Sequence, residues 1–248
     1  MSVDELLAWY EREARDLPWR RTTDPYAILV SEVMLQQTQV ARVVERYEAW
    51  LKRWPTVQAL AGASLADVLT EWSGLGYNRR AKALWEAARV VARDGWPDDL
   101  TRLPGVGPYT AAAVGSFAFG RPELAIDTNA RRVYERWGFT PAAGSAALNQ
   151  AVMELGATVC RAHVALCAQC PVTGCASRGM EVARPQRRPR VRFEDTDRYA
   201  RGRVLAALAG REPWPDFLGA ERLERAIDGL AADGLVNRED GHTTLARE

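Results

Sequence analysis

The amino-acid sequence predicts a mainly α-helical protein. Apolar side chains recur at helical spacing along most of the chain, and up to residue 180 there are neither alternating apolar–polar runs nor Asn-Gly turns. Hydrophobic residues make up 47% of the 248 positions, which is enough for two or three small domains with their own cores. The net charge of only +1 does not indicate a nucleic-acid partner, so a surface of that kind would have to be local.

Helices are expected in the first part of the chain at residues 3–14, 25–39, 40–54, 56–61, 64–72, 79–93, 108–119 and 128–137. After residue 195, two further helices at 196–209 and 221–233 precede a short hairpin between 234 and 245. Helices followed by a hairpin are typical of a winged-helix module, which often binds DNA. Packing against the rest of the chain or against a protein partner is an equal alternative.

No apolar run approaches the ~20 residues that a membrane span requires. The acidic, amphipathic N-terminus does not resemble a signal peptide, so we expect a cytoplasmic, nucleoid-associated prokaryotic protein, and a monomer. Five arginines and two prolines lie between Arg184 and Arg192. This segment is either a solvated linker or an arm that contacts phosphate.

A glycine-rich turn and the helix after it form the most informative part of the chain. The run Gly105, Val106 and Gly107 leaves backbone N–H groups free at the start of the next helix. Such N–H groups bind anions, and a DNA phosphate is the anion that we expect. An apolar segment then leads to Asp127, and Asn129 is expected to cap the following helix.

An acidic residue lies among apolar neighbours in the helix expected at 25–39. Burial there would raise the pKa of Glu32, as a general acid requires, although a solvent-facing glutamate is the ordinary alternative. Two glutamines, Gln36 and Gln37, follow about one helical turn later.

Together, the glycine turn, Asp127 and the string SEVMLQQTQV resemble the helix-hairpin-helix DNA glycosylase superfamily that includes endonuclease III, and especially its MutY-type adenine glycosylases. The resemblance covers residues 1 to about 180 and implies a two-lobed fold. The implied parts are a six-helix barrel domain at 22–128, an iron–sulfur domain formed by 1–21 and 129–180, an Arg/Pro-rich linker at 181–195 and the winged-helix-like module at 196–248.

The resemblance also implies the catalytic residues. Glu32 would protonate the adenine ring, Asp127 would stabilise the cationic sugar, and Asn129 would orient the carboxylates. Tyr109 stands where endonuclease III has a Schiff-base lysine, which implies a glycosylase without β-lyase activity. Tyr109 itself would hydrogen-bond near the carboxylates, with simple packing as the alternative.

The predicted DNA-binding residues are Gln36, Gln37, Gly105, Val106, Gly107, Arg20, Tyr77 and Asn78. By resemblance, Gln37 would wedge into the duplex beside an extruded base, since a glycosidic bond cannot be reached inside the stack. Asn78 stands where MutY-like chains usually carry an aromatic residue, which leaves the reading of the opposite base open.

All four cysteines lie close together, at Cys160, Cys167, Cys170 and Cys175. In a cytosolic chain such clustering favours a metal site over disulfides, and four thiolates suit either zinc or an iron–sulfur cluster. The spacing resembles the [4Fe–4S] loop of the superfamily, although the last gap is one residue shorter than usual.

The resemblance implies a monofunctional glycosylase that removes adenine mispaired with 8-oxoguanine or guanine from double-stranded DNA. The C-terminal part is too short for the Nudix-like domain with which MutY reads 8-oxoguanine. Three alternatives remain open: a thymine or uracil mismatch glycosylase of the same superfamily, a glycosylase with lyase activity, and an iron–sulfur protein that binds DNA without catalysis.

Overall fold

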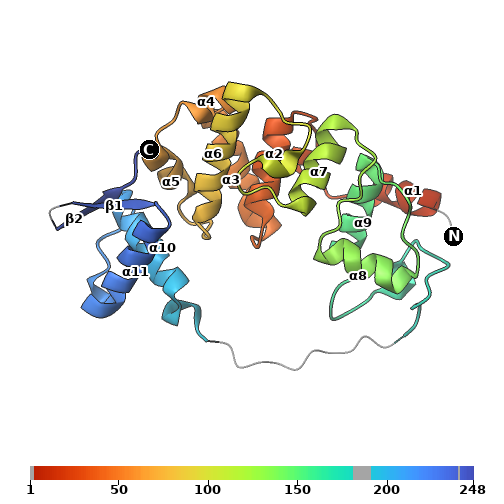
Figure 1. The fold of residues 1–248 in the computed structure, drawn as a ribbon. Helices are drawn as coiled ribbons and strands as arrows, with labels where there is room; N and C mark the ends of the chain where they lie inside the picture. The colour runs from red at the N-terminus through yellow and green to blue at the C-terminus, as the bar shows by residue number, and fades with distance from the viewer. Residues whose placement is uncertain (1–2, 181–190, 240) are drawn as a thin grey trace. The chain divides into compact units, whose positions relative to one another are not determined.

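A computed structural model describes residues 3–180, 191–239 and 241–248. The described residues form eleven α-helices, short 3-10 turns and one two-stranded antiparallel hairpin, so the mainly α-helical class is confirmed (Figure 1). Within these residues no helix is both long and apolar enough to cross a membrane. Most of the predicted linker, including the arginine-rich segment up to residue 190, lies outside the described residues.

The chain divides into two compact units. One combines residues 1–32 with 106–188, and the other combines 33–105 with 189–248. The sequence predicted boundaries near residues 21 and 128 instead, so the expected domain limits stay a prediction. Each unit is described by itself below.

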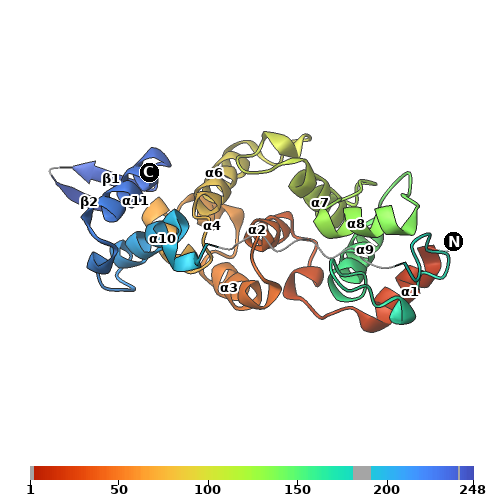
Figure 2. The same cartoon turned by 90° about the horizontal axis from the view of Figure 1, so that it is seen from below.

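The first unit is built around the helix α9, which packs against α1, α7 and α8 (Figure 2). The helices of this unit are α1 (Val3–Glu13), the first part of α2 (Pro25–Leu35), α7 (Pro108–Phe119), α8 (Thr128–Trp137) and α9 (Ala146–Thr158). The core includes Leu6, Trp137 and Leu155, each at most 2% exposed. Their burial follows from the 3.6-residue spacing of apolar side chains, which gives each helix one apolar face.

Local sequence sets the ends of α7 and α8. Pro108 opens α7 at a position where its missing N–H costs nothing, and Gly120 closes the helix in the left-handed conformation at φ 64°. Gly138 ends α8 in the same way, at φ 77°. Both helices have the bounds that the sequence predicts.

A buried ion cluster joins α9 to the segment after α1. Glu154 is fully buried, and it accepts hydrogen bonds from Arg15 at 2.7 and 2.9 Å and from Arg20 at 2.8 Å. A carboxylate can remain charged there because these hydrogen bonds replace its water. Its pKa is lowered: the two arginines outweigh the desolvation that opposes it. Arg20, predicted to bind DNA, therefore has a structural partner within its own unit.

The second unit contains a helical part and the C-terminal module of residues 196–248. Its helices are α3 (Val40–Arg53), α4 (Val57–Ala61), α5 (Leu65–Trp72), α6 (Arg79–Asp94), α10 (Asp197–Leu208) and α11 (Ala220–Ala232). Trp50 packs edge-on against both Trp54 and Trp72, with ring centroids 4.7 and 5.6 Å away. Such pairs add to the stabilisation that burial alone provides.

The hairpin follows α11 directly. Its strands β1 (Val236–Glu239) and β2 (His242–Leu245) pair with Val236 opposite Leu245. The predicted order of two helices and a hairpin is thus present, whereas the winged-helix assignment stays a prediction. The module is tied to α5, because the Leu65 N–H donates to the Arg247 carbonyl at 3.2 Å.

Candidate active site

Glu32 lies in the last turn of α2, a helix whose other residues are almost all apolar. The helix is buried along most of its length, and Glu32 is only 6% exposed. The buried reading of this residue, rather than the solvent-facing one, is the correct one.

Tyr109, in the first turn of α7, is hydrogen-bonded to the Glu32 carboxyl. Desolvation raises the pKa of Glu32 to about 7; the tyrosine hydrogen bond opposes this rise and the negative charge of Asp127 adds to it. Burial, with the two carboxylates, also raises the pKa of Tyr109 strongly. The tyrosine therefore stays protonated and serves as a hydrogen-bond donor to Glu32.

Asp127 is the N-cap of α8. Its carboxylate accepts from the Ala130 N–H at 2.6 Å and from the Asn129 side-chain amide at 3.2 Å. The prediction that Asn129 caps this helix was wrong. The extended backbone of Asp127 places its own oxygen over the first turn, where a charged acceptor is favoured by the helix dipole.

The structure thus brings Glu32, Tyr109, Asp127 and Asn129 to one place within the first unit, although they come from three different helices or their caps. Burial raises the pKa of the Glu32 carboxyl to about 7, and its neighbour Asp127 is fixed by two hydrogen bonds. Such a pair can act as a proton donor and as a stabiliser of positive charge.

Asn149 holds the segment that leads to Asp127, and the sequence reasoning missed it. Its side chain donates to the Glu123 carbonyl at 2.7 Å and to the Ser116 hydroxyl at 2.9 Å, and it accepts from the Ala125 N–H at 3.0 Å. Asn149 is 1% exposed. The sequence feature that could have identified Asn149 is its place at a core position of an otherwise apolar helix face, because a buried polar side chain needs hydrogen-bond partners.

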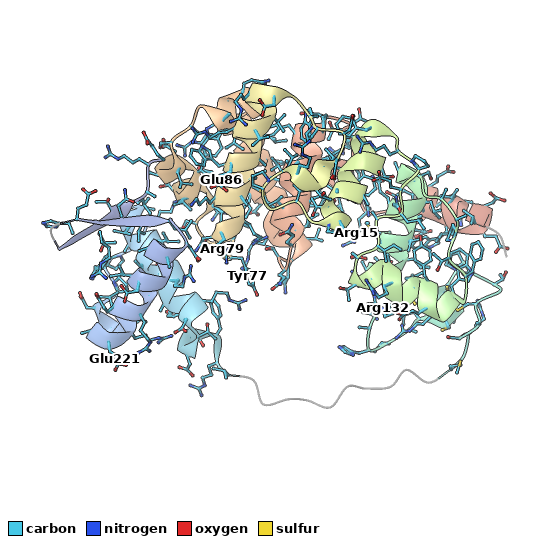
Figure 3. The ribbon with its side chains drawn as sticks, in the orientation of Figure 1. Arg15, Tyr77, Arg79, Glu86, Arg132 and Glu221 are labelled. Atoms are coloured by element: carbon cyan, nitrogen blue, oxygen red, sulfur yellow. The ribbon has the colours of Figure 1, made fainter. Side chains whose placement is uncertain are left out.

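Arg132 was also missed, and it joins Asn129 to the cysteine loop. It donates to the Asn129 side-chain oxygen at 2.8 Å, to the Gly156 carbonyl at 2.7 Å and to the Cys160 carbonyl at 2.9 Å (labelled in Figure 3). Three acceptors on one guanidinium fix Asn129 relative to α9 and to the first cysteine. No sequence pattern predicts this link, because two of the three partners of Arg132 are backbone carbonyls.

The four cysteines line a single cavity of about 280 Å³ in the first unit. Cys160 accepts from Arg136 at 3.6 Å, and burial and nearby thiols raise the pKa of Cys170. Among the described residues no three Cys, His, Asp or Glu side chains are arranged to hold a metal ion. Four thiols around one roomy cavity nevertheless fit the donor set of an iron–sulfur cluster.

In the second unit, the helix expected at residues 25–39 ends at Leu35. Arg80 accounts for this end, since its guanidinium donates to the carbonyls of Val33, Met34 and Gln36 at 2.6 to 3.1 Å. Gln37 follows in the left-handed region at φ 54°. The two predicted glutamines therefore lie on a turn and not on a helix.

Tyr77 also has a left-handed backbone, at φ 49°, and Asn78 directly precedes α6. Non-glycine residues rarely adopt this conformation, and such strain often marks a functional turn. Both side chains line a cavity with Gln36 and Gln37. Four of the predicted DNA-binding residues are thus brought together.

The glycine turn has the conformation that its sequence predicts. Gly105 lies at φ 73°, and a Cβ there would come within 2.6 Å of the Ala83 Cβ, so a side chain is excluded twice. Val106 is buried, and Gly107 is the extended N-cap of α7. Gly107 carries no side-chain cap, and α7 begins directly after it at Pro108, so the N-terminal end of this helix follows the glycine turn.

Comparison with known families assigns the class of protein. Residues 30–158 match the family described as HhH-GPD superfamily base excision DNA repair protein. The chain belongs to this superfamily, which confirms the resemblance seen in the sequence.

Individual relatives define a narrower class of protein within this superfamily. An adenine DNA glycosylase of Mycobacterium tuberculosis is 42% identical over all of this chain and 94% of the relative. That of Mycolicibacterium smegmatis is 42% identical over all of the chain and 97% of the relative, and the human one is 39% identical over 89% of the chain and 48% of the relative. The chain belongs with the adenine DNA glycosylases.

Solved structures agree in fold. A thermostable thymine-DNA glycosylase has a TM-score of 0.62 at 28% identity, covering 68% of this chain and 90% of that one. A non-covalent endonuclease III–DNA complex has a TM-score of 0.58 at 23% identity, with 68% and 89% covered. At that identity the second likeness supports the fold alone.

Proposed function

We propose that this chain excises adenine from mispairs with 8-oxoguanine or guanine in double-stranded DNA, as a base excision repair glycosylase. One observation carries the proposal. Glu32 is buried, its pKa is raised to about 7, and its carboxyl is hydrogen-bonded to Tyr109 beside Asp127. The relatives at 42% identity are adenine DNA glycosylases, which supports the choice of base.

In the proposed reaction, the mispaired adenine leaves the stack and enters the site. Glu32, protonated in a substantial fraction of molecules near pH 7, donates its proton to a ring nitrogen of the base. The C–N glycosidic bond then breaks, and its electron pair leaves with the adenine. The positive charge stays on the sugar.

Asp127 then faces the cationic sugar. Its carboxylate is held by the Ala130 N–H and by Asn129, so it needs no reorientation when the charge develops. Water adds to the sugar carbon and leaves an abasic site, and the proton of that water returns to Glu32. Asn129 is a positioning residue in this scheme, and Arg132 holds it in turn.

Tyr109 supplies no amine, so we propose that cleavage stops at the abasic site without strand scission by β-elimination. Its hydroxyl instead donates to Glu32 and sets the proton affinity of the acid. Borohydride trapping on DNA tests this point, because a Schiff base would give a covalent complex.

We further propose a [4Fe–4S] cluster held by Cys160, Cys167, Cys170 and Cys175, which line one cavity. When bound, the cluster supplies structural cross-linking of the loop and no step of the base excision. The residues of the chain itself place Arg132 and Arg136 against this loop. A thiolate-bound cluster absorbs near ~400 nm, so the purified protein tests the assignment directly.

DNA binding is assigned to the α7 N-terminus at Gly107 and to the turns that carry Gln36, Gln37, Tyr77 and Asn78. The positive end of the α7 dipole would favour a phosphate, and the strained turns would present side chains to the base stack.

The decisive experiment is single-turnover cleavage on duplexes that contain A:8-oxoG, A:G, T:G and U:G. Adenine release is expected from the first two only, and Glu32→Gln and Asp127→Asn should each abolish it while leaving DNA binding largely intact. Glu135→Gln, at an exposed carboxylate on α8, is the matched control and should behave as the parent protein. Release of thymine or uracil alone would assign the site to the mismatch glycosylases of the same superfamily.

A further inference from the structure

A second cavity, of about 490 Å³, lies in the second unit where the C-terminal module meets the Tyr77 turn. The turn contributes Gln37, Tyr77 and Arg79 to its wall, and the C-terminal module contributes Arg198, Arg201 and Asp233. Figure 3 shows Tyr77 and Arg79 together at one end of α6. The module therefore forms part of the same surface as the predicted duplex-reading turns.

The wall of this cavity is strongly basic. It carries four arginines and two aspartates, on a chain whose total charge is +1. Arg80 is occupied by the carbonyls at the end of α2, and burial lowers its pKa to about 10. The other three arginines, Arg79, Arg198 and Arg201, are placed to meet a ligand.

Arg198 has no carboxylate partner in any ion pair of the described residues. Its guanidinium lies 4.8 Å from the centre of the Tyr77 ring and 5.0 Å from that of Phe193, and it donates to the Tyr77 hydroxyl. The two rings hold the guanidinium in place while its remaining N–H groups stay available. A preorganised arginine of this kind loses little entropy when it binds an anion.

Arg79 and Arg201 share one carboxylate. Arg201 pairs closely with Asp233, whereas Arg79 lies 3.6 Å from it and its side chain is 78% exposed. The Lys82 ammonium donates to the Asp233 carbonyl at 3.4 Å and is itself paired with Glu86 at 3.8 Å. The cavity wall as a whole has four arginines against the two carboxylates of Asp197 and Asp233, so the surface keeps a local excess of positive charge.

We propose that Arg198, with Arg79 and Arg201, binds a backbone phosphate of duplex DNA beside Tyr77. This proposal rests on the proposed function, because it takes DNA as the ligand of the adjoining turns. A phosphodiester offers two unesterified oxygens, which match the paired N–H groups of a guanidinium. The C-terminal module is then a DNA-contacting part of the enzyme, and it binds the duplex next to Tyr77.

The test is fluorescence anisotropy on a duplex with an uncleavable adenine analogue, repeated at several salt concentrations. Removal of one phosphate contact lowers the slope of log K against log salt by about 0.9. Arg198→Ala should therefore weaken binding about tenfold at low salt and lower the slope by about one. Arg198→Lys should keep the parent slope, since it keeps the charge, while binding a few-fold less tightly.

The matched control is Arg225→Ala. Arg225 lies on α11 of the same module, is half exposed, pairs with Glu221 at 2.7 Å and does not line the cavity. It should bind DNA as the parent does. If Arg198→Ala and Arg225→Ala give the same affinity and slope, or if Arg198→Lys loses the slope as Arg198→Ala does, the phosphate contact is refuted.

Inorganic phosphate alone, titrated at constant ionic strength, separates a DNA contact from a small-anion site. No saturable binding is expected at millimolar phosphate, and saturable binding that Arg198→Ala abolishes without an effect on DNA would overturn the proposal. The proposed catalysis is tested apart from this surface: if Arg198 carries a phosphate contact but no adenine is released, only the catalytic proposal fails. If adenine is released and Arg198→Ala binds like the parent, only the phosphate site fails.

Discussion

Replacing Glu32 with glutamine is expected to stabilise the folded protein at alkaline pH, because it removes a buried carboxyl that resists ionisation. The pKa of Glu32 rises from its ordinary value of 4.5 to about 7. At about 1.4 kcal/mol for each tenfold change in the acid constant, this rise corresponds to about 3 kcal/mol. The isosteric amide keeps the volume of the side chain and never ionises.

The sign follows from proton binding. Between pH 4.5 and about 7 the folded state holds a proton on Glu32 that the unfolded state has released. The contribution of this group to stability is therefore complete below pH 4.5 and is lost as the pH rises through about 7. Relative to the glutamine variant, the parent should lose about 3 kcal/mol by about pH 8.5 and less than about 1 kcal/mol by about pH 5.

Urea denaturation of both proteins across this range measures the difference directly. A constant offset between them reflects the different hydrogen bonding of an amide and an acid, so the change of the difference with pH is the diagnostic quantity. A difference that stays flat from about pH 5 to about pH 8.5 would mean that Glu32 ionises normally. It would then be unsuited to donate a proton at neutral pH.

Three further predictions concern the surroundings of the site. Tyr109→Phe removes a hydrogen bond that favours ionised Glu32, so the alkaline limb of the single-turnover rate should move to higher pH; a move to lower pH contradicts this reasoning. Asn149→Ala should cost about 2–4 kcal/mol in urea denaturation, since it leaves buried partners unsatisfied, whereas exposed Asn237→Ala should change stability by less than about 0.5 kcal/mol. Cys167→Ser should bleach the absorption near ~400 nm; full retention would remove Cys167 from the proposed ligands.

The first of these tests matters for mechanism as well as for the pKa. Tyr109 is the residue on which the proposed lack of lyase activity rests, and its hydroxyl contacts Glu32 and the Met153 sulfur. If its loss changes the pH profile while adenine is still released, its contribution is to set the proton affinity of Glu32. It would then be a positioning residue and not a nucleophile.

Helix ends were predictable where a local signal exists. Pro108 and Gly120 fix both ends of α7, because proline suits a first turn and glycine adopts the left-handed end without strain. The end of α2 was not predictable. Residues up to Gln39 fit a helical pattern, but Arg80, more than forty positions away, takes the carbonyls that would have continued the helix.

The cap of α8 shows the same limit at shorter range. Aspartate and asparagine are both good cap residues, so Asp127 and Asn129 are two acceptable caps that stand two positions apart. In the folded structure Asp127 is the cap, since the segment before it is extended and is held by hydrogen bonds to Asn149. That choice also fixes the carboxylate that the proposed chemistry needs.

The sequence by itself determined the helical class, the glycine turn, the clustered cysteines and the family, because these depend on short spacings along the chain. Only the tertiary structure decided that Glu32 is buried against Tyr109, that Asn149 and Arg132 hold the second carboxylate, and that the C-terminal module places Arg198 over Tyr77. Proton affinity and ion pairing depend on distance and exclusion of water between residues far apart in the chain. Those quantities exist only after the chain has folded.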